Sequence, residues 1–176
     1  MNKIQDIVKC TSFPDYDVLY CDPPWEDRMV KFFQTQTKKQ SGVIVDNNIN
    51  DIIISLAKLS NTKKPVYIEY SIKGSDFVIN TMTKYGHIFN QKQELIQSNN
   101  KPYVIMSFNT DLIIPKNLKG IEIIKYVIKK NQVIFDPFAG IGFTARVVLE
   151  LGAKYIGYEL NPKRFERLEN ICKQYR

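Results

Sequence analysis

The segment from Val133 to Glu159 constrains the fold of this 176-residue chain more than any other. A short apolar run, Val133 to Phe135, leads into a turn that contains Gly140 and Gly142, and an apolar pattern with helical spacing follows. A second apolar run ends in Glu159. Strand, glycine turn, helix and strand in this order predict a parallel βαβ unit. We therefore expect an α/β fold with a doubly wound, Rossmann-like sheet.

The glycine turn also indicates the kind of ligand. Gly140 and Gly142 allow the main chain to approach a bound molecule at the start of the helix. The spacing lacks the third glycine of the dinucleotide fingerprint, which makes a pyrophosphate site less favoured. Glu159 is placed to accept hydrogen bonds from ribose hydroxyls. The pattern predicts a nucleoside site, the alternative for Glu159 being a solvated charge at a strand end.

A second motif, Asp22-Pro23-Pro24-Trp25, follows the apolar run 18–21. Neither proline has an amide hydrogen, so this backbone cannot continue a sheet and presents its carbonyl groups in a fixed direction. The Asp22 carboxylate and the Pro23 carbonyl together suit the two hydrogens of a planar amino group. Trp25 offers an aromatic face on which a base can stack. The alternative is an ordinary turn with Trp25 in the core.

Together the two motifs resemble those of the S-adenosylmethionine-dependent amino-methyltransferases, which methylate N6 of adenine or N4 of cytosine. The catalytic motif comes first and the cofactor motif last, as in the permuted beta class of DNA methyltransferases. The resemblance covers nearly the whole chain. It implies that Asp22, Pro23, Pro24 and Trp25 bind the target amino group and its base. It implies a cofactor site made by Asp136, Pro137, Phe138, Ala139, Gly140, Gly142, Thr144, Glu159 and Asn161.

Some of these residues have a structural alternative. Asn161 precedes Pro162 and is expected to act mainly as a helix N-cap. Phe138 could belong to the core. The resemblance gives an acid near the cofactor adenine, and Asp6 is the acid in that part of the chain, although a surface position is the expectation for it.

The resemblance implies methyl transfer from the cofactor S-adenosylmethionine to DNA, with N6 of adenine as the target. Aspartate rather than serine at position 22 favours adenine over N4 of cytosine. N4-cytosine methylation and RNA N6-adenine methylation remain open. So do a non-catalytic nucleic-acid-binding subunit, a methyltransferase acting on another planar amide, and a different nucleotide enzyme.

Charge and length bear on partners. The net charge of +7 suits nucleic acid if the basic residues cluster, and several lie in the segment 28–39. Relatives that read a sequence usually insert a recognition domain before the last helix that precedes the cofactor motif, whereas here only about residues 109–117 are available. We therefore expect a homodimer or a separate recognition subunit.

The remaining features predict one domain over residues 1–176. No apolar run approaches the ~20 residues of a membrane span, and the amino terminus lacks a secretory pattern, so a cytoplasmic location without membrane contact is expected. Three cysteines without paired spacing and one histidine predict reduced thiols and no metal site.

Local patterns predict the other elements. We expect a loop over 26–48, helices over about 51–59, 75–86 and 118–130, and strands at 66–70, 88–97 and 103–108, the last two forming an edge hairpin. Phe77 is expected on the inner face of its helix, and His87 is expected to have a surface or helix-capping role.

Overall fold

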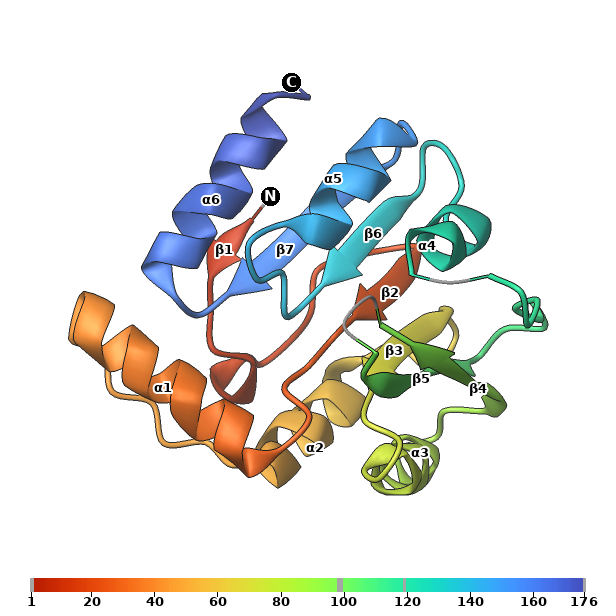
Figure 1. Ribbon diagram of the computed structural model, residues 1–176, viewed down its shortest axis with the longest axis horizontal. Coiled ribbons are helices and arrows are strands. Elements are labelled where there is room, and N and C mark those ends of the chain that lie inside the picture. The colour runs from red at the N-terminus through yellow and green to blue at the C-terminus, as the bar shows by residue number, and fades with distance from the viewer. Residues whose placement is uncertain (1, 98–99, 119, 176) are drawn as a thin grey trace.

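A seven-stranded sheet forms the centre of the protein, seen in a computed structural model that describes residues 2–97, 100–118 and 120–175 (Figure 1). The strand order is β1-β7-β6-β2-β3-β5-β4. Described neighbours pair in parallel except at β5, which runs antiparallel to β3 and to β4. The strands are β1 (Lys3–Ile4), β2 (Val18–Cys21), β3 (Val66–Tyr70), β4 (Phe89–Ile96), β5 (Pro102–Phe108), β6 (Val133–Asp136) and β7 (Lys154–Glu159). The predicted doubly wound α/β sheet with an antiparallel edge hairpin is confirmed.

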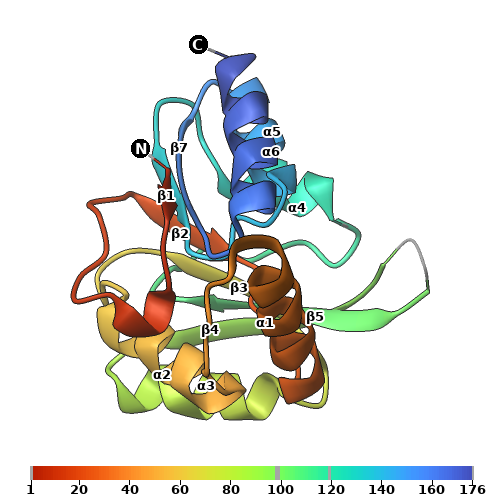
Figure 2. The ribbon, with the colours of Figure 1, turned by 90° about the vertical axis from the view of Figure 1, so that its left-hand side faces the viewer.

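Helices cover both faces of the sheet because the central strands are apolar on both sides. In β2, Val18 and Tyr20 pack on one face, and Leu19 and Cys21 pack on the other. The first face is covered by α4, α5 and α6, and the second by the 3-10 helix η1 together with α2 and α3 (Figures 1 and 2). Their bounds are η1 (Ile7–Lys9), α2 (Ile49–Leu59), α3 (Ser75–Lys84), α4 (Ile121–Val127), α5 (Phe143–Glu150) and α6 (Pro162–Lys173).

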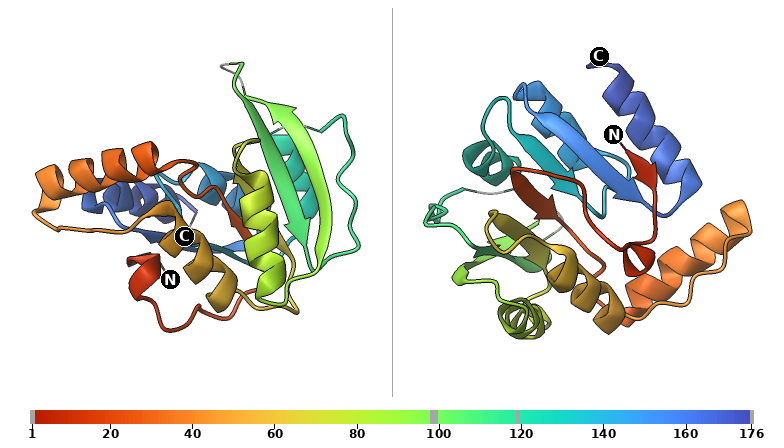
Figure 3. Two further views of the ribbon diagram at one scale, coloured as in Figure 1. Left: turned by 90° about the horizontal axis from the view of Figure 1, so that it is seen from below. Right: turned by 180° about the vertical axis from the view of Figure 1, so that it is seen from behind.

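The segment 26–48 was expected to be a loop, and this expectation is wrong. It contains the 15-residue helix α1 (Asp27–Ser41). The loop was predicted because the segment is rich in polar residues such as lysine and glutamine, but these two residues are good helix formers. The half-buried Phe33 and the buried Val30 and Thr37 recur at helical spacing, which gives α1 one face to pack with. It lies beside α6, beyond the carboxyl end of β7 (Figures 1 and 3).

Three smaller expectations are also corrected. The helix expected at 118–130 is shorter than predicted: only α4 is helical, because the backbone leaves the helical conformation at Ile128. Phe77 is 39% exposed, because Val78 and Met82 already fill the inner face of α3. His87 is buried rather than at the surface, with its Nε2 atom 3.2 Å from the Ala57 carbonyl oxygen.

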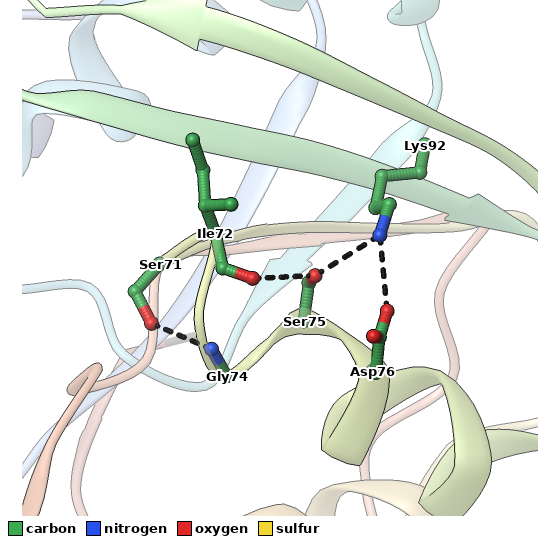
Figure 4. Close-up of polar contacts among 6 residues, drawn as sticks. All are labelled: Ser71, Ile72, Gly74, Ser75, Asp76 and Lys92. Carbon is green, nitrogen blue, oxygen red and sulfur yellow. Dashed lines mark hydrogen bonds and ion pairs between the residues drawn. The ribbon is translucent and has the colours of Figure 1, made fainter.

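The edge hairpin is tied to α3 by a polar cluster at the first turn of that helix (Figure 4). The Lys92 ammonium of β4 donates to the Ser75 hydroxyl at 3.3 Å and to the Asp76 carboxylate at 3.0 Å. The Ser75 hydroxyl in turn donates to the Ile72 carbonyl oxygen at 2.8 Å. The helix start and the hairpin therefore hold one another in place on the same side of the sheet.

The sheet has a topological switch between β2 and β6. These strands are neighbours, but the chain leaves β6 toward β7 and leaves β2 toward β3, which lie on opposite sides. In open α/β sheets such a switch opens a crevice at the carboxyl ends of the strands, and ligands bind there. Asp136 ends β6 and Asp22 directly follows β2. The two predicted motifs therefore meet at the crevice.

Candidate active site

A cavity of about 440 Å³ occupies this crevice and brings most of the predicted site residues together. The predicted residues that line it are Asp22, Pro23, Pro24, Asp136, Pro137, Phe138, Ala139, Gly140, Thr144, Glu159 and Asn161. Trp25 and Gly142 are outside this lining. Asp6, Asn47, Glu69 and Tyr103 also line it, together with one face of α1. A volume in this range suits a cofactor or another small molecule.

Strand register places three carboxylates in a row at the base of the cavity. Tyr20 pairs with Tyr67 and Cys21 with Ile68, so the next position, Asp22, lies level with Glu69. On the other side of β2, Leu19 pairs with Phe135, so Tyr20 lies level with Asp136. Side chains alternate along a strand, which puts these groups on one face of the sheet. Asp136, Asp22 and Glu69 thus come from three adjacent strands.

Asp22 is held in a defined orientation. The Trp25 indole Nε1 donates to its Oδ1 atom at 2.7 Å. Although the carboxylate opens into the cavity, surrounding protein removes most of its hydration, and this desolvation raises the pKa of Asp22 to about 7. The nearby Glu69 raises the pKa further, while the bond from Trp25 lowers it. One oxygen of Asp22 is used by Trp25, which leaves the other for a ligand.

Trp25 lies against the wall rather than in the cavity lining. Its ring is nearly parallel to that of Tyr103, with 6.2 Å between the ring centroids and 10° between the planes. It also packs against the buried residues on both faces of the sheet. In this arrangement Trp25 orients Asp22, and its stacking partner is Tyr103.

Asp136 is built into the turn that follows β6. Its Oδ1 accepts the Phe138 amide at 2.9 Å, and its Oδ2 accepts the Tyr155 hydroxyl at 3.0 Å. Burial raises the pKa of Asp136 to about 7, and these two hydrogen bonds oppose the shift. The carboxylate therefore fixes the course of the glycine turn while it lines the cavity.

The two glycines of the turn serve different purposes. Gly140 lines the cavity and has φ of +56°, and a Cβ atom there would meet only the Phe138 carbonyl oxygen, at an ordinary contact distance of 3.9 Å. Gly142 has φ of +92° and faces α6, where a Cβ atom would lie 3.0 Å from Ile171 and 3.1 Å from Leu168. Glycine at position 142 is needed for the packing of α5 on α6, whereas Gly140 leaves room for a ligand.

Gly142→Ala is expected to lower the free energy of unfolding by about 2–4 kcal/mol, because backbone strain adds to the clash with α6. Gly42→Ala is the matched control, since Gly42 has φ of +73° but nothing within 4 Å of a Cβ position. It should cost about 1–2 kcal/mol from strain alone. Urea unfolding measures both, and equal losses would contradict the packing role of Gly142.

Glu159 and Asn161 form the far end of the cavity. The Glu159 carboxylate accepts the Asn161 amide at 2.7 Å. Burial raises the pKa of Glu159, and hydrogen bonds from backbone amides and the charge of Arg164 oppose the shift. The Asn161 side chain accepts the Lys163 and Arg164 amides at 3.0 and 3.1 Å, so the expected N-cap of α6 is confirmed.

Asp6 was expected at the surface, but it is buried and lines the cavity. Its Oδ1 accepts the Val8 amide at 3.0 Å and the Asn47 side-chain amide at 2.9 Å. Its Oδ2 is buried and has no hydrogen-bond partner among the described residues. Buried carboxylate oxygens are normally paired, so Oδ2 is an open acceptor for a ligand donor. Only the weak likeness to an acid in relatives pointed to Asp6.

The helix α1 covers the same end of the cavity. Met29, Val30 and Phe33 contribute to the lining. The Arg164 guanidinium of α6 lies 4.3 Å from the centre of the Phe33 ring. The side-chain amide nitrogen of Asn161 lies 3.4 Å from the Thr37 hydroxyl. Because α1 begins two residues after Trp25, one continuous segment connects the predicted catalytic motif to the helix that covers Glu159.

The described residues contain no group of three or more histidine, cysteine, aspartate or glutamate side chains arranged to hold a metal ion. None of their helices combines the length and apolar character that crossing a bilayer requires.

The family model described as DNA methylase, for N6 and N4 methyltransferases, matches residues 16–170. The chain belongs to this family. It is therefore a DNA methyltransferase of the N6-adenine and N4-cytosine family. No curated protein matches the sequence.

Several solved structures share the fold. The complex of M1.HpyAVI with S-adenosylmethionine is 15% identical, with a TM-score of 0.62 and coverage of 89% of this chain and 88% of that one. TTHA0409 from Thermus thermophilus, complexed with S-adenosyl-L-methionine, is 14% identical, with a TM-score of 0.64 and coverage of 99% and 93%. The cytosine-N4-specific PvuII DNA methyltransferase is 12% identical, with a TM-score of 0.62 and coverage of 99% and 91%.

Proposed function

We propose that this DNA methyltransferase belongs to the permuted beta class and transfers a methyl group from S-adenosylmethionine to N6 of adenine in DNA. One observation carries the proposal: a single cavity joins Asp22, Pro23 and Pro24 to the glycine turn and Glu159. A base amino group at one end and a nucleoside cofactor at the other would therefore share one space.

The cofactor end fits S-adenosylmethionine by its chemistry. Glu159 is an acceptor for ribose hydroxyls, and the unpaired Oδ2 of Asp6 is an acceptor for the amino group of the cofactor adenine. Gly140 leaves space beside the methionine portion, over the carboxylate of Asp136. S-adenosylmethionine supplies an electrophilic methyl group when it is bound.

The base end is made by Asp22 and the backbone of Pro23. The Asp22 oxygen not used by Trp25 accepts one hydrogen of the adenine amino group, and the Pro23 carbonyl accepts the other. These bonds draw the nitrogen lone pair out of conjugation with the ring, which makes the nitrogen nucleophilic. The base has to leave its stack to reach this position. Tyr103, which lines the cavity and stacks on Trp25, supplies aromatic surface beside it.

Basic residues around the cavity support a nucleic-acid substrate. Arg28, Lys31, Lys38 and Lys39 are all exposed on α1, which covers the cavity. Exposed cations at a site entrance attract the phosphate backbone. None of these four cations takes part in the two salt bridges formed among the described residues.

Sequence recognition is proposed to come from a second copy or a separate subunit. The segment that carries a recognition domain in longer relatives is here a short connection held against β4. The Gln91 side chain exchanges hydrogen bonds with the Ile114 backbone at 3.0 and 2.8 Å, and Gln93 donates to the Pro115 carbonyl at 3.2 Å. This connection covers the edge strand β4. Few residues are therefore left in it to contact DNA bases.

The likeness to the cytosine-N4-specific PvuII enzyme keeps N4 of cytosine as the second candidate. One experiment separates the two. The protein is incubated with methyl-tritiated S-adenosylmethionine and with single-stranded DNA, duplex DNA and RNA of mixed sequence, and the products are digested to nucleosides and identified by mass. N6-methyldeoxyadenosine is the expected product. N4-methyldeoxycytidine, or label only in RNA, would refute the proposal.

Methyl transfer is expected to fall as the pH drops below about 7, because Asp22 then takes up a proton and loses an acceptor for the amino group. The raised pKa of Asp22 places this loss well above the range of an ordinary aspartate. The measurement is kcat/KM between pH 5.5 and 9. A profile that stays flat down to pH 5.5 would contradict the role of the ionised carboxylate.

A further inference from the structure

Phe32 is an aromatic side chain exposed on the helix that covers the cavity. It belongs to α1 and is 55% exposed. At 3.6 residues per turn, one flank of this helix carries Arg28, Phe32, Gln36 and Lys39. Gln36 lines the cavity, so this flank lies next to it, whereas Arg28 and Lys39 are exposed. The flank therefore presents one aromatic ring between two cations beside the cavity.

The Phe32 ring is held at the border of the cavity by its neighbour Phe33. The two rings meet edge to face, with 5.6 Å between their centroids and 64° between their planes. Phe33 lines the cavity, and the Arg164 guanidinium lies 4.3 Å from its ring centre. Contacts thus run from α6 through the cavity wall to the surface, and they support the Phe32 ring from one side only.

The charges beside Phe32 indicate the kind of molecule that can cover it. Positions 28 and 39 are 11 residues apart, or about 16 Å along the helix axis. This length corresponds to about five nucleotides of one DNA strand at 3.4 Å each. A second copy of the chain would bring the same excess of positive charge, +7, toward this flank. A polyanion with flat apolar bases fits both the cations and the ring.

We propose that Phe32 stacks on a DNA base adjacent to the target nucleotide, while Arg28 and Lys39 contact phosphates on either side of that base. This inference rests on the proposed function, which puts the target base in the cavity. When the target base leaves its stack, its neighbours lose a stacking partner. An aromatic ring at the border of the cavity supplies a face to one of them. Phe32 therefore acts on DNA binding and not on cofactor binding.

DNA affinity measures this contact. The ligand is an oligonucleotide that the wild type methylates, and Kd is determined by fluorescence anisotropy with S-adenosylhomocysteine present to prevent turnover. Phe32→Ala should weaken binding about 5- to 150-fold, the loss of one base–aromatic stack. Phe32→Trp should bind about as tightly as the wild type. Phe32→Leu keeps apolar bulk but has no aromatic face, so it should bind nearly as weakly as Phe32→Ala.

Phe89→Ala is the matched control. Phe89 is 38% exposed, and its ring meets that of Phe108 edge to face at 5.7 Å and 64°, much as Phe32 meets Phe33. Phe108 pairs with both Phe89 and Val66, so Phe89 lies level with the amino end of β3, at the opposite edge of the sheet from the cavity. Phe89→Ala should leave DNA affinity unchanged. Neither alanine variant should change the affinity for S-adenosylmethionine.

Altered DNA and salt separate stacking from charge. Two further oligonucleotides lack the base on the 5′ side or on the 3′ side of the target. On one of them the loss caused by Phe32→Ala should shrink to less than about twofold, because no base is left to stack. Arg28→Gln and Lys39→Gln should each reduce the slope of log Kd against log salt concentration by about 0.9, whereas Phe32→Ala should leave the slope unchanged.

Three results would each overturn the inference: wild-type DNA affinity in Phe32→Ala, wild-type DNA affinity in Phe32→Leu, or a loss in Phe32→Ala that is equal on the intact and both abasic DNAs. Lower cofactor affinity in Phe32→Ala but not in Phe89→Ala would show that Phe32 only supports the cavity wall, and would also contradict it. The proposed function is read from the labelled nucleoside rather than from DNA affinity, so its failure is distinguishable. Label in RNA alone would refute both.

Discussion

Replacing Asp22 with alanine is expected to lower methyl transfer at least about 100-fold while S-adenosylmethionine still binds. The reason is that the proposed function gives Asp22 the contact to the base amino group, whereas the proposed cofactor contacts lie elsewhere in the cavity, at Asp6, Gly140 and Glu159. Asp22→Asn should lose nearly as much, because its NH2 group would face the amino hydrogens of the base. Single-turnover transfer of the tritiated methyl group, with cofactor affinity from calorimetry, measures the two properties separately.

Asp15→Asn is the control, since Asp15 is an exposed aspartate that does not line the cavity. It should match the wild type in both measurements. The indole of Trp25 loses its acceptor in Asp22→Ala, so the unfolding midpoint of each variant is compared as well. Equal methyl transfer by Asp22→Ala and the wild type would refute the role given to Asp22.

The parts of the site that follow a strand directly could be predicted from the sequence. Asp22 and Asp136 lie at the ends of short apolar runs, and the carboxyl ends of neighbouring parallel strands meet at one edge of a sheet. Glu159 ends β7 and the N-cap Asn161 comes two residues later, so both could be placed at the same edge of the sheet. Local pattern and sheet geometry were sufficient for these residues.

The residues that were missed depend on contacts between distant segments. The helix α1 owes its buried face to α6, through contacts such as Arg164 over Phe33, and its own composition gives no strong apolar stripe. Asp6 becomes a buried cavity residue only because Asn47, 41 residues away, folds back onto it. Glu69 is next to Asp22 through the register of β2 and β3, which a single sequence does not specify.

Gly142 illustrates a different limit. From the sequence alone, a glycine at the start of a helix after a strand gives no indication whether it makes room for a ligand or for another helix. Here a Cβ atom at Gly140 would have only an ordinary contact with the Phe138 carbonyl oxygen, whereas the space beside Gly142 is filled by Leu168 and Ile171 of α6. The G-x-G spacing therefore contains one glycine that faces the cavity and one that faces the core.

Replacing Glu159 with glutamine is expected to weaken S-adenosylmethionine binding about 10- to 100-fold, because a hydrogen bond to a charged acceptor is worth about 1.5–3 kcal/mol. Glutamine keeps one oxygen for the Asn161 amide, but its NH2 group cannot accept from a ribose hydroxyl. The same NH2 group also faces backbone donors, so a small loss of thermal stability accompanies the change. Calorimetric titration with S-adenosylmethionine measures the affinity, and Glu166→Gln on the exposed face of α6 is the control.

The Glu159 and Asp22 variants should show opposite patterns. With saturating cofactor, Glu159→Gln is expected to regain most of the wild-type rate of methyl transfer, since the contacts to the base are intact. Asp22→Ala should gain nothing from more cofactor, because its defect lies in the step that uses the amino group. A Glu159→Gln variant with normal affinity would show that Glu159 serves only the turn before α6. One that stays inactive at saturation would show that the two ends of the cavity are not independent.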